Sequence, residues 1–207
     1  ILKSHFNVPV ILTNDANAGA IGEMLFGGAK GMKDFIYITL GTGVGSGIVS
    51  NGKLIYGHDG LAGEIGHTYA IPDGRECGCG RKGCLETYAS ATGITRTAVE
   101  FLQNTTIGSR LRDIELDKID SKRIYEFALE GDELSLMIFD FTSDILGRAL
   151  ADATAYTSPE AIFLFGGPAN AGDFIFKPVK KYMEHYMLNI YKNKVKLSAS
   201  LLKQGQA

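Results

Sequence analysis

The residues best suited to chemistry form a compact group in the first half of the chain. Cys77, Cys79 and Cys84, the only cysteines, lie within eight positions, and His67 precedes them by ten residues. The glycines between them let the backbone turn tightly enough for neighbouring sulfur atoms to converge. Three thiolates and one imidazole fill the tetrahedral shell of a zinc ion and leave no open position, which is typical of structural zinc. The spacing therefore predicts a structural zinc site.

The alternative is one disulfide with a spare thiol. An odd number of cysteines is not typical of a secreted disulfide framework. Cys77 and Cys79 are also too close in sequence to bridge with normal disulfide geometry. Reduced, metal-bound cysteines indicate the cytosol as the compartment.

Acidic residues flank the predicted metal loop on both sides. Glu64 lies three residues before His67, and Glu86 lies two residues after Cys84. A bound metal ion would hold both carboxylates at fixed positions, where they could accept hydrogen bonds from the hydroxyl groups of a sugar. The alternative is that both are solvated charges on a surface loop.

A second candidate site is the glycine-rich segment Gly-Thr-Gly-Val-Gly-Ser-Gly at 41–47, which follows a predicted buried strand at 34–40. Alternating glycines expose backbone N–H groups to a phosphate, and the hydroxyl groups of Thr42 and Ser46 add donors. The segment runs into a strand and lacks the lysine of a Walker loop. By itself it is equally typical of a glycine-rich β-turn.

Asn14 and Asp15 lie between a predicted strand at 8–12 and a predicted helix at 16–26. A carboxylate at the end of a strand could act as general base toward a substrate hydroxyl group. The alternative role of either residue is that of a helix N-cap.

The remaining pattern alternates strands with helices, which predicts an α/β layered domain. Asn51-Gly52 predicts a tight hairpin, and Gly166-Gly167 ends a buried strand, where α/β folds bind ligands. The other strands are expected at 48–50, 53–56, 161–165 and 194–197, and the other helices at 86–102, 121–129, 132–156 and 173–189.

Composition limits the possible classes of protein. The chain has 207 residues, 45% of them hydrophobic, and a formal net charge of −2, which is ordinary for a globular chain with a buried core. This balance gives no electrostatic reason to expect nucleic-acid binding by these residues. No apolar run approaches the roughly 20 residues that span a bilayer, and the first residues do not form a signal-peptide pattern.

Taken together, these motifs resemble the ROK family of bacterial sugar kinases, repressors and related open reading frames. The most specific part runs from Gly41 to Glu86 and contains Ala-Gly-Glu-Ile-Gly-His followed by Cys-x-Cys-Gly-x-x-Gly-Cys-Leu-Glu. The resemblance implies the actin-like, ribonuclease H-like ATPase fold. It makes residues 1–207 a single C-terminal ATPase and sugar-binding domain, with the zinc loop at 67–86, from a two-lobed sugar kinase. The Asp-x-Gly-Gly-Thr phosphate loop of family kinases does not occur in this sequence, so we expect the N-terminal lobe upstream of Ile1.

The resemblance also implies a role for each candidate residue. Asp15 matches the catalytic base, and the neighbouring Asn14 matches a sugar contact. The remaining matches are sugar-hydroxyl contacts at Glu64, His67 and Glu86, a phosphate turn at Gly41, Thr42 and Gly43, an adenosine contact at Gly166 and Gly167, and structural zinc on His67, Cys77, Cys79 and Cys84.

The expected function of the full-length protein is ATP-dependent phosphorylation of a hexose at its 6-hydroxyl group, with glucose as the expected hexose and magnesium on the ATP. A cytoplasmic homodimer is expected, and residues 1–207 alone are expected to have little or no kinase activity. The alternative is a sugar-responsive repressor of the same family, which would bind nucleic acid through a helix-turn-helix upstream. A third interpretation is a catalytically idle, zinc-stabilised dimerisation module.

Overall fold

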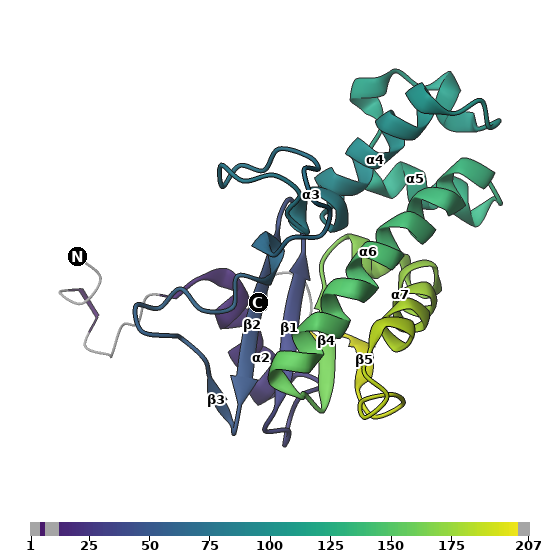
Figure 1. Cartoon of the computed structure of the whole chain (residues 1–207). Coiled ribbons are helices and arrows are strands. Elements are labelled where there is room, and N and C mark those ends of the chain that lie inside the picture. Colours follow the sequence, from purple (N-terminus) through teal and green to yellow (C-terminus); the bar gives the residue numbers. More distant parts are fainter. Residues whose placement is uncertain (1–4, 7–12, 203–207) are drawn as a thin grey trace.

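The computed structural model describes residues 5–6 and 13–202, and a mixed sheet forms the centre of this part of the chain (Figure 1). Its five strands lie in the order β3-β2-β1-β4-β5. Strand β1 is antiparallel to β2 and parallel to β4, and β4 is parallel to β5. The strands are β1 Phe35–Leu40, β2 Val44–Ser50, β3 Lys53–Leu54, β4 Ala161–Phe165 and β5 Lys196–Ala199.

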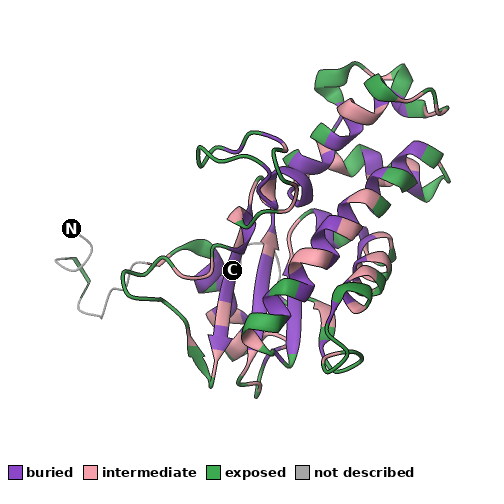
Figure 2. Ribbon diagram, viewed as in Figure 1, coloured by how far each residue is buried: buried purple, intermediate pink, exposed green. Residues whose placement is uncertain are grey.

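Strand β1 is buried on both faces because helices cover the sheet on both sides (Figure 2). Successive side chains of a strand point to opposite faces. Ile36, Ile38 and Leu40 accordingly join the larger core under the main helical layer. Phe35 and Tyr37 join a smaller core together with Ala20 of the helix on the other face. This two-sided burial explains the nearly continuous apolar run in the sequence.

Helix α2 (Asp15–Phe26) lies directly on β2, and the glycines of that strand make the close approach possible. A Cβ atom added at Gly47 would lie 2.6 Å from Cβ of Ala20. One added at Gly45 would lie 3.0 Å from Cβ of Ala16. The alternating glycines at 45 and 47 therefore make room for α2, which brings the first residue of this helix over the start of β2.

The other face of the sheet carries the main helical layer. The long helix α6 packs along α7, and their contact is close because a Cβ atom at Gly147 would lie 2.6 Å from Cβ of Tyr182. Helices α4 and α5 extend away from the sheet at the end where β1 terminates (Figure 1). The helices of this layer are α3 Glu86–Ala89, α4 Ala91–Asn104, α5 Ser121–Leu129, α6 Glu133–Thr157 and α7 Asp173–Tyr186.

Most of the predicted elements are present; β3 ends at Leu54 instead of the expected 56, and four further differences follow. Strand β2 begins at Val44, so the glycine-rich turn is only 41–43 and the expected turn at 41–47 is wrong. The expected single helix 86–102 is interrupted at Ser90, whose backbone is extended and whose side chain caps α4 by accepting from the N–H of Gly93.

The other two differences lie near the C-terminal end. Helix α7 ends at Tyr186, before the expected 189, and β5 lies at 196–199, two residues later than expected. The expected strand at 8–12 lies outside the described residues. The Asn51-Gly52 hairpin is confirmed, with φ angles of 51° and 73° at its two central residues.

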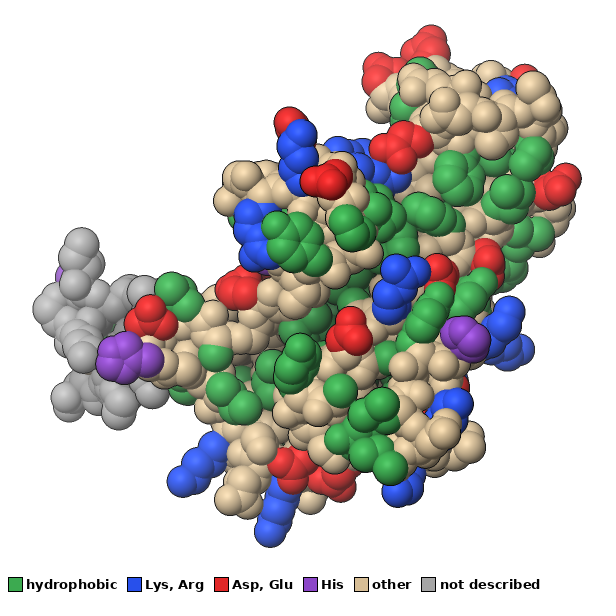
Figure 3. Space-filling model, in the orientation of Figure 1, with side chains coloured by type: hydrophobic (Ala, Val, Ile, Leu, Met, Phe, Trp, Pro, Cys, Tyr) green, Lys and Arg blue, Asp and Glu red, His purple; other side chains and the backbone are tan. Residues whose placement is uncertain are grey.

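Charged side chains of both signs are scattered over the face shown in Figure 3, with apolar side chains between them. None of the helices in the described ranges combines the length and the apolar composition that crossing a bilayer requires.

Candidate functional site

Asn14 and Asp15 have different roles at the start of α2. Asn14 is the N-cap, and its Oδ1 accepts a hydrogen bond from the N–H of Asn17 at 2.7 Å. Asp15 is the first helical residue and is exposed. Its Oδ1 accepts from the N–H of Ala16 at 2.8 Å, and its Oδ2 has no hydrogen-bond partner among the described residues. The N-cap alternative therefore applies to Asn14, and Asp15 keeps one carboxylate oxygen available to a ligand.

The turn at Gly41, Thr42 and Gly43 is held by the N-terminus of α4. The N–H of Ala91 donates to the carbonyl of Gly41 at 2.8 Å, and the hydroxyl of Thr92 donates to the carbonyl of Thr42 at 2.7 Å. Within the described part of the chain, the N–H groups of Thr42 and Gly43 have no hydrogen-bond partner. Two free backbone donors on a fixed turn are the groups that a phosphate needs.

Ser46 does not serve as the predicted phosphate donor. Its hydroxyl donates to the carbonyl of Gly63 and accepts from the N–H of Ile65 at 3.2 Å. Since both bonds are made to the residues on either side of Glu64, Ser46 fixes the segment that carries this carboxylate. The prediction for Ser46 was wrong because its partners are distant in sequence.

The four predicted metal ligands converge. One ligand atom from each of His67, Cys77, Cys79 and Cys84 can be chosen so that all lie within 4.8 Å of one another. Nδ1 of His67 lies 3.6 Å from Sγ of Cys77, and Sγ of Cys79 lies 3.6 Å from Sγ of Cys84. Tetrahedral zinc, with Zn–S of about 2.3 Å and Zn–N of about 2.0 Å, spaces such atoms by about 3.5–3.8 Å.

The same distances exclude the disulfide alternative. A disulfide requires sulfur atoms about 2.05 Å apart, whereas Sγ of Cys79 and Sγ of Cys84 are 3.6 Å apart. All three cysteines are free thiols. The donor set and its spacing therefore fit a tetrahedral zinc ion.

Two of the thiols lie in contrasting environments. Hydrogen bonding from the backbone of Arg81 lowers the pKa of Cys79, which is exposed. Burial raises the pKa of Cys84 to about 12. Because the thiolate is the form that binds metal, Cys84 depends on a cation to lose its proton, and Cys79 ionises more readily.

Glu86 and Glu64 each lie close to one of the predicted metal ligands. Glu86 is the first residue of α3 and half-buried; its Oε2 accepts from the N–H of Val44 at 3.0 Å. Its Oε1 lies 3.8 Å from Sγ of Cys77. Oε2 of Glu64, an exposed residue, lies 4.0 Å from Nε2 of His67. Glu86 is therefore not a free solvated charge. Its carboxylate connects the loop at 67–86, called the metal-ligand loop below, to the glycine turn at 41–43.

Gly166 brings the end of β4 against the end of β1. Its φ of 105° is a conformation that favours glycine. A Cβ atom at this position would lie 2.2 Å from the carbonyl oxygen of Leu40. Gly166 therefore allows Gly166-Gly167 to reach the same edge of the sheet as the turn at 41–43.

A single pocket of about 660 Å³ joins these residues at that edge. It is bordered by all the predicted site residues except the three cysteines, which lie behind it. Sequence reasoning missed Thr39 and Phe165, whose only signal was their position at strand ends. The predicted residues that line it are Asn14, Asp15, Gly41, Thr42, Gly43, Glu64, His67, Glu86, Gly166 and Gly167.

A second pocket of about 500 Å³ meets the first at Gly167. It is largely apolar, and helix α5 forms one wall with Lys122, Tyr125 and Leu129. Sequence reasoning missed this wall, because an amphipathic helix with an apolar face reads as ordinary core packing.

The fold and site define a class of protein: a domain of the actin-like ATPase fold whose main pocket lies beside a cluster of one histidine and three cysteines that could hold a metal ion. The ROK family profile matches residues 1–207. The chain belongs to the ROK family.

Individual relatives agree with this assignment. A glucokinase from Halalkalibacterium halodurans is 42% identical over 189 residues, which are 90% of this chain and 57% of that protein. A structure of a ROK family glucokinase from Streptomyces griseus, in complex with glucose and AMPPNP, superposes with a TM-score of 0.88 at 34% identity, covering 99% of this chain and 67% of that one. The structure of a ROK family transcriptional regulator, a homologue of the E. coli MLC protein, also superposes with a TM-score of 0.88. The two chains are 30% identical, and the match covers 99% of this chain and 51% of that one. The chain thus spans less than two thirds of the length of its curated relative.

Proposed function

We propose that this chain is the C-terminal lobe of a two-lobed, ATP-dependent hexose kinase that converts glucose to glucose 6-phosphate. The observation that carries the proposal is the single pocket that places Asp15, the free N–H groups of the turn at 41–43 and the carboxylate of Glu86 around one space. Phosphoryl transfer to a sugar requires a general base, hydrogen-bond donors to the phosphate groups and hydrogen-bond acceptors for the sugar hydroxyl groups. The glucokinases among the relatives support glucose as the substrate.

In this proposal, the sugar lies between the N-terminus of α2 and the metal-ligand loop. Glu64, His67 and Glu86 accept and donate hydrogen bonds to the ring hydroxyl groups, with Asn14 beside them. His67 turns Nδ1 toward Cys77 and Nε2 toward Glu64, so one nitrogen serves the metal and the other the sugar. The free Oδ2 of Asp15 accepts the proton of the 6-hydroxyl group as the hydroxyl oxygen attacks the γ-phosphorus. The bond between that phosphorus and the β–γ bridging oxygen breaks, and ADP leaves.

The triphosphate lies along the turn at 41–43, with N–H groups of Thr42 and Gly43 donating to its oxygens. The adenosine passes Gly166-Gly167, and its base enters the apolar second pocket beside Tyr125. The first pocket is lined by three carboxylates, those of Asp15, Glu64 and Glu86, and by no lysine or arginine of the described residues. We therefore infer that ATP binds with magnesium, which supplies the positive charge that this lining lacks.

We propose that zinc is the resident metal and that it supplies structural order only. His67, Cys77, Cys79 and Cys84 would hold it, and they fill its four positions, so no position remains for a substrate. The glycine-rich loop buries little apolar surface, and metal binding offsets the entropy of ordering it. Reduced thiols and an ATP-dependent sugar kinase fit a cytoplasmic protein, and we propose that it is a homodimer.

A sugar-responsive repressor is the second candidate, because the regulator and the glucokinase superpose on this chain with the same TM-score. The fold therefore does not discriminate between them. A carboxylate with a free oxygen at Asp15 favours the kinase, since a sensor needs no base.

A coupled ATP-consumption assay of the two-lobed protein with a panel of sugars tests the proposal. The panel would contain glucose, N-acetylglucosamine, N-acetylmannosamine, fructose and allose. We expect turnover with glucose at the highest kcat/KM. Sugar binding without turnover of any sugar would contradict the kinase and support the repressor.

A further inference from the structure

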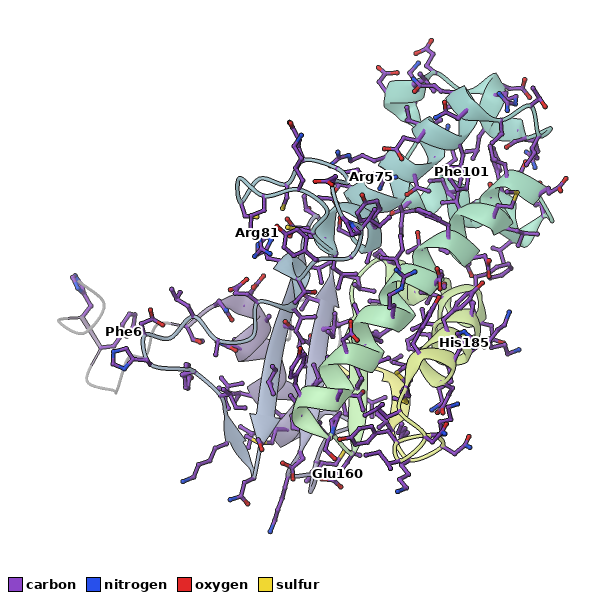
Figure 4. The ribbon with its side chains drawn as sticks, in the orientation of Figure 1. Phe6, Arg75, Arg81, Phe101, Glu160 and His185 are labelled. Carbon is purple, nitrogen blue, oxygen red and sulfur yellow. The ribbon has the colours of Figure 1, made fainter. Side chains whose placement is uncertain are left out.

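The metal-ligand loop has a second anchor that does not involve the metal. Arg75 lies between His67 and Cys77 in sequence and is buried, with a side chain only 6% exposed. Figure 4 shows it where the loop meets α3 and the start of α4. A buried arginine so close to the site needs a physical explanation, because burying a charge is costly unless it is fully paired.

All five N–H donors of the Arg75 guanidinium are used. Two form a fork on the carboxylate of Glu100, at 2.8 and 2.6 Å. One donates to the hydroxyl of Thr97 at 2.9 Å. The last two donate to the backbone carbonyls of Thr87 and Gly93, at 2.6 and 3.1 Å. The guanidinium is thus held in one orientation against α3 and α4.

The backbone of Arg75 is bonded as well. Its N–H donates to the phenolic oxygen of Tyr88 at 2.9 Å, and its carbonyl accepts from the N–H of Gly83 at 2.8 Å. The guanidinium lies 4.4 Å from the ring centroid of the same tyrosine, within the range of a cation–π contact. Arg75 therefore connects α3 to the loop segment that contains Arg75 itself and to the segment that contains Gly83.

These contacts place Glu86 between two anchors. Cys84, a metal ligand, lies two residues before it, and Thr87 and Tyr88, which Arg75 contacts, follow it directly. None of the Arg75 contacts runs through a metal ligand. The position of α3, and with it the carboxylate of Glu86, is therefore held even where the metal contributes nothing.

We propose that Arg75 is a positioning residue of the sugar site. It fixes α3 and its first residue, Glu86, independently of the metal, while the metal fixes Cys77 to Cys84. The contacts of Arg75 with α3 and α4 are called the Arg75 clamp below. The consequence for sugar binding rests on the proposed function, whereas the clamp does not. When Arg75 is shortened, sugar binding must order α3, so the affinity for sugar falls and the chemical step at Asp15 is little changed.

The test compares Arg75→Lys with Arg112→Lys in the two-lobed protein. Arg112 is the matched control: it donates to the carbonyls of Leu102, Thr105 and Ile107 at the other end of α4, outside the pocket. Arg75→Lys should keep its zinc but increase hydrogen–deuterium exchange at 86–90. It should raise the sugar KM about tenfold, with kcat within about threefold. Arg112→Lys should leave exchange at 86–90 and the sugar KM unchanged.

Metal removal supplies the complementary arm. Chelation of the parent protein should increase exchange at 77–84 and leave 86–97 protected, the reverse of the Arg75→Lys pattern. If Arg75→Lys does not fold, Glu100→Gln replaces it in the test, because it keeps an oxygen acceptor but removes the charge. This variant should show smaller increases in exchange at 86–90 and in the sugar KM.

The results separate the two proposals. Unchanged exchange at 86–90 in the Arg75 or Glu100 variant, or an equal rise in Arg112→Lys, would overturn the clamp. A parent protein that phosphorylates no sugar would overturn the proposed function, and the exchange measurements would still decide the clamp.

Discussion

Replacing Asp15 by asparagine removes the proposed base and almost nothing else. In the structure the only hydrogen bond that the Asp15 carboxylate accepts, among the described residues, is the one from the N–H of Ala16 to Oδ1. The amide oxygen of asparagine can accept the same bond, and the N-cap Asn14 is untouched. We therefore expect Asp15→Asn to fold normally, with a Tm close to that of the parent.

The expected loss of rate follows from the role. Positioned general bases contribute about 10²–10⁴-fold to a rate, which corresponds to about 3–5 kcal/mol of barrier at 1.36 kcal/mol per tenfold. The proposed ring hydroxyl contacts at Glu64, His67 and Glu86 are unaffected by this change, so the dissociation constant for the sugar should change by less than about threefold. The loss should therefore fall on kcat.

The assay measures kcat by coupled ATP consumption and the sugar affinity by calorimetry, both on the two-lobed protein. Asp34→Asn is the matched control, since Asp34 also accepts hydrogen bonds, from Ser50 and Asn51, but at the far end of β1 from the pocket. A kcat for Asp15→Asn within about threefold of the parent would refute the assignment of Asp15 as base. A kcat loss of the same size in the Asp34 variant would refute it as well.

Two further predictions concern stability. Cys84→Ala should abolish zinc binding, measured by elemental analysis. It should also lower Tm by about 4–8 °C, the shift expected when the free energy of unfolding of a chain of this size falls by about 2 kcal/mol. Adding zinc, but not magnesium, back to chelated parent protein should restore its Tm. Asp132 caps α6 and accepts from Ser109, Arg110 and Ser135, so Asp132→Ala should cost about 1–2 kcal/mol in urea unfolding at pH 7. Burial alone would raise the pKa of Asp132, but these hydrogen bonds outweigh it and the pKa is lowered. Because the pKa is lower in the folded state, the ionised carboxylate stabilises the fold above the unfolded pKa of about 3.9. That contribution should disappear as the pH falls below about 4, so Asp132→Asn, which retains a capping oxygen, should approach the parent in stability there. A stability difference that stayed constant from pH 7 to pH 3 would contradict this account.

Local patterns allowed much of the fold to be predicted. The hairpin at Asn51-Gly52 follows from the positive φ that both positions adopt. The N-cap at Asn14 follows from a short polar side chain that precedes a helical run. These features depend on residues within a few positions of one another, so backbone sterics and side-chain reach decide them.

The errors arose where a local pattern had a distant partner. The glycines at 45 and 47 suggested a phosphate loop, but they are in a strand and make room for α2. Ser46 was expected on a phosphate and instead bonds to Gly63 and Ile65. Arg75 carried no recognisable signal, because its ion-pair partner Glu100 is 25 residues away.

The sequence by itself determined the family and the set of candidate metal ligands, because His67 and the three cysteines lie within a short loop that can close around one ion in few ways. Only the tertiary structure decided that this loop, α2 and the glycine turn surround one pocket. That arrangement depends on the antiparallel pairing of β1 with β2 and the parallel pairing of β1 with β4, which bring Gly43 and Gly166 to one edge of the sheet. Such pairings are selected by burying both faces of the sheet at once, and no window of local sequence contains that information.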